Sequence, residues 1–291
     1  MPSLRTHILC FAGAYLSLSP AQAAVAKYLV VFGDSYSTTN SWVGSTAPST
    51  SNPIGNPSFP GTTTSGGLNW VGQVIAKQNT SLVFAYDLAV TGATTDKEIV
   101  DTYAQYNFDD QVETLFNTYL AGSSAPWENI GDVMTTVWVG INDVGEPFWD
   151  GVPAPVGAIL DRYFGLLETL YATGLRNYIL FTIPPFDRAP AILYQSADRV
   201  ASLRSDIKTY NAGLASRLAA FKSKHSDIKA RLFDTAPTFT TVLDNPTAYG
   251  APDATCVNGD GKSCLWADTY HPGLVIHEHL AEALVKAVDF F

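Results

Sequence analysis

Five short apolar segments alternate with longer stretches of helical periodicity, and this alternation restricts the fold more than any other feature of the chain. The apolar segments occupy residues 28–32, 82–90, 133–141, 178–183 and 228–233. Helical spacing of apolar residues fills 68–77, 108–120, 156–173, 198–224 and 274–288. Strands that are apolar on both faces are typical of a parallel sheet covered by helices on both sides. We therefore expect an α/β fold, a three-layer α/β/α sandwich around a mainly parallel five-stranded sheet.

The first 23 residues have the pattern of a secretory signal peptide. Arg5 supplies a positive charge, and the apolar stretch over 8–18 that follows is too short to span a bilayer. Small residues provide a cleavage site after Ala23, and cleavage after Ala26 fits equally well. We expect a secreted, extracellular protein without a membrane-spanning segment.

Composition narrows the class of partner. The 291-residue chain carries a net charge of −10, and its Lys and Arg residues form no cluster, so binding to nucleic acid or to an anionic membrane is not expected. Only 15% of the residues are charged, and the many Ser, Thr, Gly, Tyr and Trp residues suit an uncharged polar partner such as a carbohydrate. No repeat or linker divides residues 24–291, which we predict to form one domain, assumed to be monomeric.

Removal of the signal peptide leaves two cysteines, Cys256 and Cys264. Two cysteines so close in an exported protein usually form a disulfide, which would stabilise the fold by roughly 2.5 kcal/mol in the chain-entropy model. Two free thiols or a metal site are the alternatives, although no further ligands with suitable spacing lie nearby. Asn79 begins the only Asn-x-Ser/Thr sequon without proline and is a candidate glycosylation site.

Ser35 appears just after the first apolar segment stops at Gly33. Parallel α/β sheets bind ligands at the carboxyl ends of their strands, so this serine is a candidate nucleophile, although most serines at such positions only cap a turn or helix. The second and third strands lead to Gly92 and Asn142, which offer a backbone N–H and a side-chain amide. These two kinds of donor form oxyanion holes, yet each residue taken alone is more often a turn former.

A serine nucleophile requires a base, and the base requires an orienting group. His271 precedes the last helix, and Asp268 stands three residues earlier, a spacing that in a tight loop lets the carboxylate reach one imidazole nitrogen. Alternatively, Asp268 caps the helix and His271 is a surface residue. His225 is expected to be solvated, while His277 and His279 should face different sides of the last helix without the spacing of a zinc site. No metal or cofactor is expected.

Four blocks resemble, in order, the signature blocks of the GDSL (SGNH) esterases. They are 33–36 (GDSY), Gly92, 140–143 (GIND) and 268–272 (DTYHP), and they extend over nearly the whole chain after the signal peptide. Residues 183–190 (IPPFDRAP), together with the DTYHP block, resemble the fungal acetylesterases of carbohydrate esterase family 16. The chain departs from the pattern at three positions, where other residues are frequent: Tyr36 for leucine, Thr91 for glycine and Asp87 for asparagine.

The resemblance implies a flavodoxin-like SGNH hydrolase fold and a serine-esterase mechanism. Ser35 would be the nucleophile, His271 the base and Asp268 its orienting group. The N–H groups of Ser35 and Gly92 and the side chain of Asn142 would form the oxyanion hole, each donor lowering the barrier by ~3–4 kcal/mol. Activity should fall in acid, because the base must be neutral to accept a proton.

The leading hypothesis is a secreted serine esterase that removes acetyl groups from plant-cell-wall oligosaccharides. A lipase or phospholipase acting on longer acyl chains is the alternative. A glycosidase that uses Asp143, Glu146 and Asp150 is less favoured, because we expect these residues in a polar loop as solvated or capping groups. A carbohydrate-binding protein without catalytic activity is a further alternative.

Overall fold

The computed structural model describes residues 26–291, and the predicted signal peptide, residues 1–23, lies outside this part. Five strands form one sheet in the order β2-β1-β3-β4-β5, and every neighbouring pair is parallel. The strands are β1 (Lys27–Gly33), β2 (Val83–Asp87), β3 (Val133–Trp138), β4 (Asn177–Phe181) and β5 (Lys229–Phe233). The predicted α/β fold with a five-stranded parallel sheet is confirmed.

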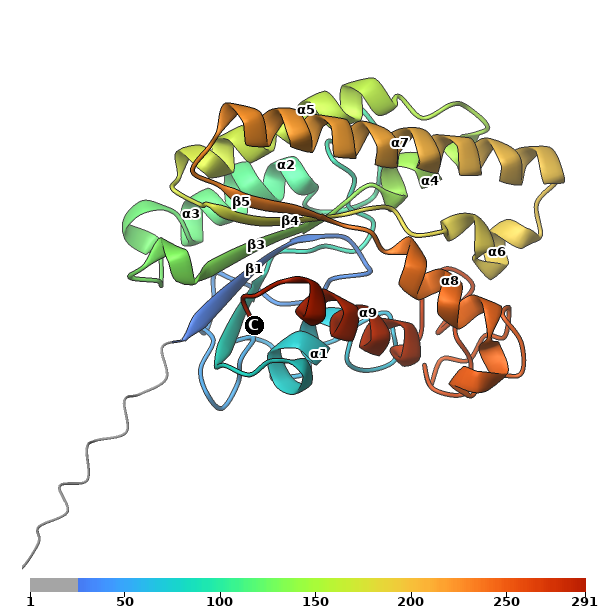
Figure 1. Ribbon diagram of the computed structural model, residues 1–291, viewed down its shortest axis with the longest axis horizontal. Helices are drawn as coiled ribbons and strands as arrows, with labels where there is room; N and C mark the ends of the chain where they lie inside the picture. Colours follow the sequence, from blue (N-terminus) through green and yellow to red (C-terminus); the bar gives the residue numbers. More distant parts are fainter. Residues whose placement is uncertain (1–25) are drawn as a thin grey trace, which may run out of the picture.

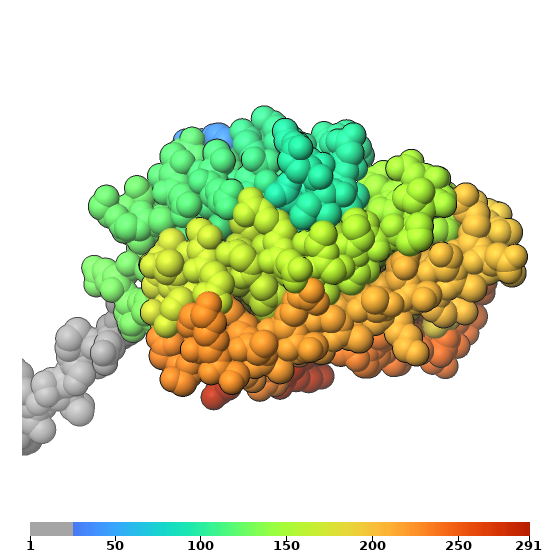
Figure 2. Space-filling view, turned by 90° about the horizontal axis from the view of Figure 1, so that it is seen from above, coloured from blue at the N-terminus to red at the C-terminus, as the bar shows by residue number. Residues whose placement is uncertain are grey.

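Helices cover both faces of the sheet (Figure 1). On one face lie α2 (Phe108–Asp110), α4 (Ile141–Asp150), α5 (Val156–Ala172) and α7 (Ala197–Lys224). On the other face lie α1 (Trp70–Gln73), α8 (Ala236–Asp244) and α9 (Leu274–Ala287). Figure 2 looks onto the first of these layers, where α5 and α7 lie side by side. The core is therefore divided into two parts, one on each side of the sheet.

Shorter helical segments extend or connect these helices. The π-helical segment η1 (Val74–Gln78) continues α1, and η2 (Gln111–Phe116) joins α2 to α3 (Asn117–Tyr119). The remaining ones are η3 (Gly122–Ser124), η4 (Ile130–Asp132), η5 (Phe186–Arg188), α6 (Pro190–Leu193) and η6 (Pro246–Tyr249). None of the helices within residues 26–291 is both long and apolar enough to cross a bilayer.

Strand β1 lies inside the sheet, between β2 and β3. Its residues Leu29, Val30, Val31 and Phe32 have no exposed surface. Because neighbouring strands and both helical layers surround it, the strand is apolar on both faces, as its sequence indicated. The chain leaves this protected strand directly into Gly33, Asp34 and Ser35.

The region after β3 differs from the prediction. The strand ends at Trp138 instead of Ile141, and the polar loop that we expected around Asp143, Glu146 and Asp150 is the helix α4. This helix buries one face, formed by Ile141, Val144 and Phe148. Burial of that face stabilises the helix although Pro147, in its interior, cannot donate a backbone hydrogen bond. Asn142 is thus the second residue of a helix and not the end of a strand.

The irregular segment 37–65 packs against the outer edge of the sheet. The Ala85 N–H of β2 donates to the Pro53 carbonyl at 2.9 Å, and the Thr62 N–H donates to the Thr39 carbonyl at 3.0 Å. Backbone groups of the edge strand that would otherwise lack partners are thereby satisfied. At its end the segment returns to the nucleophile strand, where the Thr64 hydroxyl donates to the Ser35 carbonyl at 2.7 Å.

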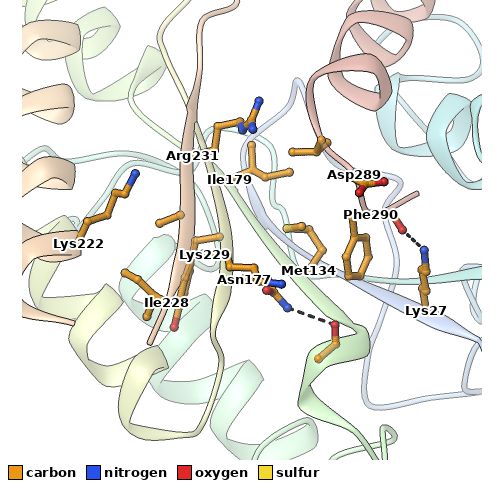
Figure 3. Close-up of a pocket in the computed structure, with 14 residues that line it drawn as sticks. Lys27, Met134, Asn177, Ile179, Lys222, Ile228, Lys229, Arg231, Asp289 and Phe290 are labelled. Carbon is orange, nitrogen blue, oxygen red and sulfur yellow. Dashed lines mark hydrogen bonds between the residues drawn. The ribbon is translucent and has the colours of Figure 1, made fainter. Parts of the chain in front are cut away.

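A cavity of about 580 Å³ opens at the amino ends of the strands (Figure 3). Its lining includes Lys27, Asn177 and Lys229, which begin β1, β4 and β5, together with Phe290 near the end of the chain. This is the edge of the sheet opposite to Ser35, which follows the carboxyl end of β1. The cavity is therefore separate from the residues that the sequence singled out.

Candidate active site

Ser35 is held in a tight turn at the carboxyl end of β1. The N–H groups of Ser37 and Thr38 both donate to the Asp34 carbonyl at 3.0 Å, which reverses the chain just after the strand. The Ser35 side chain lies at this turn, and only 3% of the residue is exposed. Its position at the edge of the sheet agrees with the usual ligand side of parallel α/β folds.

A hydrogen-bond chain links Ser35 to His271 and Asp268. The Ser35 Oγ lies 2.8 Å from His271 Nε2, and His271 Nδ1 lies 2.7 Å from Asp268 Oδ2. The second carboxylate oxygen of Asp268 accepts the N–H groups of Tyr270 and His271, each at 2.7 Å. The loop thus fixes the carboxylate, and the carboxylate orients the imidazole with Nε2 toward the serine.

The electrostatics of Asp268 suit the orienting role. Partial burial would raise the pKa of this carboxyl, but the hydrogen bond and positive charge of His271, with the N–H groups of Tyr270 and His271, hold the pKa below its usual value. Asp268 is therefore a carboxylate at neutral pH and can accept the Nδ1–H of His271. The alternative in which Asp268 only caps the last helix does not agree with these contacts.

Two hydrogen bonds bring Gly92 and Asn142 to the serine. The Val90 N–H donates to the Gly33 carbonyl at 3.1 Å, so the chain that leads to Gly92 runs beside the chain that leads to Ser35. The Asn142 side chain donates to the carbonyl of Ala93, the residue after Gly92, at 2.9 Å. Three segments far apart in the sequence therefore meet at one edge of the sheet.

The backbone N–H groups of Ser35 and Gly92 have no hydrogen-bond partner among residues 26–291. Gly92 has a φ of +81°, and a Cβ at this position would lie 2.8 Å from the ring of Tyr103. The backbone conformation favours glycine there, and a Cβ would also force the exposed Tyr103 ring to shift. Unpaired N–H groups beside a serine and its base are what stabilisation of an oxyanion demands.

Gln111 makes a contact with the end of β1 that the sequence did not predict. Its side chain accepts the N–H of Gly33 at 3.0 Å and donates to the carbonyl of Gly33 at 2.8 Å, and the residue is fully buried. The amide group thus pairs with the end of β1 as a neighbouring strand would. No local pattern indicated this pairing, because 78 positions separate the two residues.

Asp34 and Asp143 lie buried near the site and do not take part in the hydrogen-bond chain. Burial raises the pKa of Asp34 to about 8 and that of Asp143 to about 7. Asp34 accepts the Tyr36 N–H at 2.9 Å, and Asp143 accepts the Thr95 N–H at 2.9 Å. Both carboxyls therefore hold backbone turns.

The carboxylates of the glycosidase alternative lie on helix α4, so their placement in a polar loop is wrong. Asp143 has no exposed surface, which leaves it inaccessible to a sugar. Asp87, where the sequence departs from the esterase pattern, accepts both the N–H and the hydroxyl of Thr39 at 2.7 Å. It fastens segment 37–65 to the end of β2.

The three other histidines within residues 26–291 lie outside the hydrogen-bond chain. His277 and His279 do face different sides: His277 is buried and accepts the Trp70 N–H, whereas His279 contacts Glu282. The expectation for His225 is wrong, because its Nε2 lies 2.9 Å from Glu168 and its side chain is only 10% exposed. In the part of the chain that the structure describes, no group of three or more His, Cys, Asp or Glu residues could hold a metal ion.

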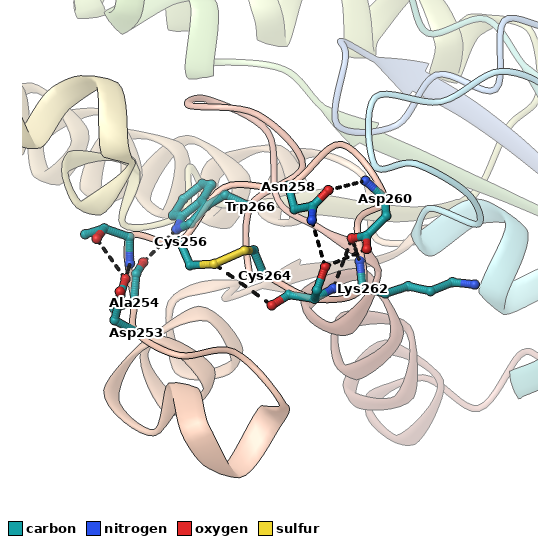
Figure 4. The surroundings of a disulfide bond; sticks show 10 residues. Asp253, Ala254, Cys256, Asn258, Asp260, Lys262, Cys264 and Trp266 are labelled. Atoms are coloured by element: carbon teal, nitrogen blue, oxygen red, sulfur yellow. Dashed lines mark hydrogen bonds between the residues drawn. A yellow bond between two sulfur atoms is a disulfide. The ribbon is translucent and has the colours of Figure 1, made fainter.

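Cys256 and Cys264 form a disulfide (Figure 4). The loop that it closes packs directly against the segment with Asp268 and His271: the Asn258 N–H donates to the Trp266 carbonyl at 3.0 Å, and the indole of Trp266 donates to the Ala254 carbonyl at 2.9 Å. The disulfide-closed loop therefore supports the segment that carries Asp268 and His271.

Asn79 follows η1 and is partly buried. Its side-chain Nδ2, the atom to which a glycan would be attached, donates to the Val74 carbonyl at 2.7 Å. Attachment of a glycan to Nδ2 would disturb this hydrogen bond. Glycosylation of Asn79 stays a prediction.

This arrangement, a serine linked through histidine to aspartate beside unpaired N–H groups, is that of a serine hydrolase on an α/β/α scaffold. The sequence matches the family model "GDSL-like Lipase/Acylhydrolase" over residues 29–284. The chain belongs to this family of carboxylic ester hydrolases, as its signature blocks predicted.

Relatives of known name agree with this family. The chain is 45% identical to an acetylesterase of Thermothelomyces thermophilus over 266 residues, which cover 90% of this chain and 88% of the relative. It is 22% identical to an acetylesterase of Hypocrea jecorina over 326 residues, covering 94% of this chain and 92% of the relative.

Solved structures share the fold. A catalytic mutant of Axe2, an acetylxylan esterase from Geobacillus stearothermophilus, has a TM-score of 0.53 at 15% identity, covering 91% of this chain and 95% of that one. The acetyl xylan esterase AlAXEase has a TM-score of 0.52 at 13% identity, covering 90% and 99%. At such low identity the likeness concerns the fold alone.

Proposed function

We propose that the protein is a secreted serine acetylesterase that removes acetyl groups from plant-cell-wall oligosaccharides. The observation that carries the proposal is the continuous hydrogen-bond chain from Ser35 Oγ through both nitrogens of His271 to Asp268. An activated serine hydroxyl is what attack on an ester carbonyl requires.

The first half of the reaction transfers the acetyl group to the enzyme. Ser35 Oγ attacks the carbonyl carbon while its proton passes to His271 Nε2, and the N–H groups of Ser35 and Gly92, with the amide of Asn142, stabilise the oxyanion. The bond to the alcohol oxygen then breaks, and Nε2 returns the proton to that oxygen. The free alcohol leaves, and acetyl-Ser35 remains.

The second half releases the acid. Water attacks acetyl-Ser35 and gives a proton to His271 Nε2, and a second oxyanion forms at the same donors. The bond from the acetyl carbon to Oγ breaks, Oγ takes the proton from Nε2, and acetate departs. Asp268 remains a carboxylate throughout, because it stabilises the imidazolium without accepting its proton.

Three features support an acetylated sugar as the substrate. The relative with 45% identity is named an acetylesterase. Tyr103 beside Gly92 is 78% exposed, and Trp149 on the helix of Asn142 is 40% exposed, so both aromatic rings are free to pack on a sugar ring. The low fraction of charged residues, 15%, agrees with an uncharged polar substrate.

Export is supported by the signal-peptide pattern and by the disulfide, which forms in oxidising compartments. Residues 24–291 would then be the mature domain. Sequencing the amino terminus of the secreted protein tests this: a start at Ala24 or Lys27 agrees with the two predicted cleavage sites, whereas a start at Met1 contradicts export through this segment.

The catalytic assignment is tested with Ser35→Ala. We expect kcat on 4-nitrophenyl acetate to fall by at least about 10⁴-fold, because the nucleophile is lost. Ser41→Ala, which removes a hydroxyl from the neighbouring loop, is the matched control and should retain activity. Substantial activity in Ser35→Ala would contradict the mechanism.

The substrate class is tested with a chain-length series and with sugars. Acetate esters should be hydrolysed faster than butyrate and octanoate esters, and acetylated xylo-oligosaccharides should release acetate. Faster hydrolysis of octanoate would favour the lipase alternative and overturn the acetyl preference. Hydrolysis of small acetates without release from any acetylated oligosaccharide would contradict only the carbohydrate part.

A further inference from the structure

Tyr36 directly follows the serine, and its side chain reaches the loop that carries His271. The Tyr36 hydroxyl donates to the Tyr270 carbonyl at 2.6 Å, across 234 positions of sequence. The centroid of its ring lies 5.7 Å from that of the His271 imidazole. Tyr36 is therefore in contact with both the backbone and the side chain of this loop.

The ring of Tyr36 is fixed by its surroundings. Only 1% of the residue is exposed, and the ring packs edge to face on Trp138 with centroids 5.6 Å apart and planes at 87°. Trp138 is in turn stacked on Phe181, and its indole donates to the Thr182 carbonyl at 3.2 Å. The phenol is thus supported by the ends of β3 and β4 and is shielded from solvent.

The peptide between Tyr270 and His271 is held from both sides. Its carbonyl accepts the Tyr36 hydroxyl, and its N–H donates to Asp268 at 2.7 Å. This peptide determines where the Cα of His271 stands. Asp268 orients the imidazole, and the bond from Tyr36 ties the backbone of the loop to the segment that carries Ser35, beside the bond between His271 Nε2 and Ser35 Oγ.

We propose that Tyr36 is a positioning residue whose hydroxyl sets the distance between His271 Nε2 and Ser35 Oγ. This inference rests on the proposed roles of Ser35 and His271. Leucine, the residue that the family name specifies here, has no hydroxyl to donate. The departure from the family pattern at this position thus adds a hydrogen bond between nucleophile strand and base loop.

The phenol remains a donor over the working range of the enzyme. Burial raises the pKa of Tyr36 well above its usual value, and the nearby Tyr270, Asp34 and Asp268 act in the same direction. The bond to Tyr270 should therefore persist at neutral and mildly basic pH. Displacement of a catalytic group by about 1 Å can lower a rate by about 10²-fold, so a loosened loop has a measurable effect.

Tyr36→Phe is the decisive variant, because it removes the hydroxyl and retains the ring. Tyr178→Phe is the matched control: Tyr178 is equally buried, donates to the Leu175 carbonyl at 2.9 Å, and stands near the amino end of β4. Three quantities are measured for each: kcat and KM on 4-nitrophenyl acetate, the rate of inactivation by phenylmethylsulfonyl fluoride, and Tm. The sulfonyl fluoride reports the reactivity of the serine without a sugar or acetyl group.

For Tyr36→Phe we expect kcat and the inactivation rate to fall together by about 10- to 100-fold, with KM within about threefold of the wild type. Tyr178→Phe should change neither rate, although its Tm should fall by a similar amount. If Tyr36→Phe loses Tm as the control does but keeps both rates within twofold, the positioning role is wrong and the bond is only structural.

Tyr36→Leu is the second variant and introduces the residue that the family name specifies at this position. It should show the same parallel loss of kcat and inactivation rate, and unchanged rates would overturn the inference. Inactivation of the wild type by the sulfonyl fluoride distinguishes a failure of the Tyr36 inference from a failure of the proposed function. If the sulfonyl fluoride does not modify Ser35 of the wild type, the serine mechanism fails, whereas equal modification of wild type and variants contradicts only the role of Tyr36.

Discussion

The side-chain amide of Asn142 donates to the carbonyl of Ala93 at 2.9 Å. This bond joins the beginning of helix α4 to the segment with the unpaired N–H of Gly92. An amide has two N–H groups, so one can hold Asn142 in place while the other remains available to a developing oxyanion. The same side chain therefore both assembles the proposed oxyanion hole and contributes to it.

Asn142→Ala should lower kcat by about 10²- to 10³-fold with little change in KM, because the lost donor acts on the oxyanion and not on the bound ester. Steady-state kinetics on a small acetate ester provide the measurement. Asn142→Asp retains the size but replaces the donor with a negative charge, and should lose at least as much. A kcat within threefold of the wild type for Asn142→Ala would remove Asn142 from the mechanism.

Asp268→Asn should lower kcat by about 10³- to 10⁴-fold, because an amide in place of the carboxylate favours the wrong tautomer of His271. The Asn oxygen can still accept the N–H groups of Tyr270 and His271, so circular dichroism should show an unchanged fold. Asp260→Asn, in the nearby disulfide loop, is the control and should keep its activity. A loss below tenfold in Asp268→Asn would indicate that the imidazole is oriented by other contacts.

Gly92→Ala should reduce kcat by at least about tenfold, since a Cβ would contact the Tyr103 ring and the φ of +81° strains any other residue. The double variant Gly92→Ala, Tyr103→Ala removes the steric part and leaves the backbone strain. We expect it to recover part of the lost kcat relative to Gly92→Ala, measured against Tyr103→Ala alone. Full activity of Gly92→Ala would contradict the tight packing at this position.

Replacing both Cys256 and Cys264 by serine should lower the free energy of unfolding by about 2.5 kcal/mol. Urea unfolding measures this difference. Because the closed loop hydrogen-bonds to Trp266, kcat should fall as well, and reduction of the wild type should reproduce both effects. Unchanged kcat with reduced stability would mean that the loop stabilises the fold without positioning His271.

The buried, neutral His277 should make the stability of the fold depend on pH. Burial lowers the pKa of His277 to about 3, with the charge of His271 acting in the same direction, whereas an unfolded histidine titrates near pH 6.5. Between these values the unfolded chain binds a proton that the folded chain does not. Stability from this group is present above pH 6.5 and is lost as the pH falls toward 3, at about 1.4 kcal/mol per pH unit.

His277→Asn should remove this dependence, because an asparagine side chain does not titrate. Its amide oxygen can still accept the Trp70 N–H, so the local hydrogen bond is retained. The difference in free energy of unfolding between wild type and variant should change by about 2 kcal/mol from pH 7.5 to pH 5. The raised pKa values of Asp34 and Asp143 act with the opposite sign, but both proteins share them and they cancel in the difference. A difference that does not change with pH would show that burial leaves the pKa of His277 where it stands in the unfolded chain.

Local sequence patterns predicted the strands well, because a strand buried on both faces is apolar over nearly its full length. They failed at α4, where Gly145 and Pro147 suggested a loop. The helical signal was present in the spacing of Ile141, Val144 and Phe148. Packing of that face, with the Arg199 guanidinium 4.7 Å from the ring of Phe148, stabilises a helix that propensity disfavours.

In the site, too, some residues could be predicted from the sequence and others could not. Ser35, His271 and Asp268 could be assigned because their spacing and order resemble a known family, and the structure brings all three into hydrogen-bond contact. The supporting contacts of Tyr36 and Gln111 could not, because each joins residues far apart in the sequence through a single side chain. Such pairings depend on how the strands and loops meet in space.

The separation of Ser35 and His271 by 236 positions has a consequence for synthesis. The nucleophile follows β1, the first strand to be translated, whereas the base is translated 236 residues later. Nascent chains, and chains shortened by proteolysis before residue 271, hold a serine without a base and should be inert toward esters. Hydrolytic activity therefore requires that the chain extends at least to His271 and has folded so that His271 meets Ser35.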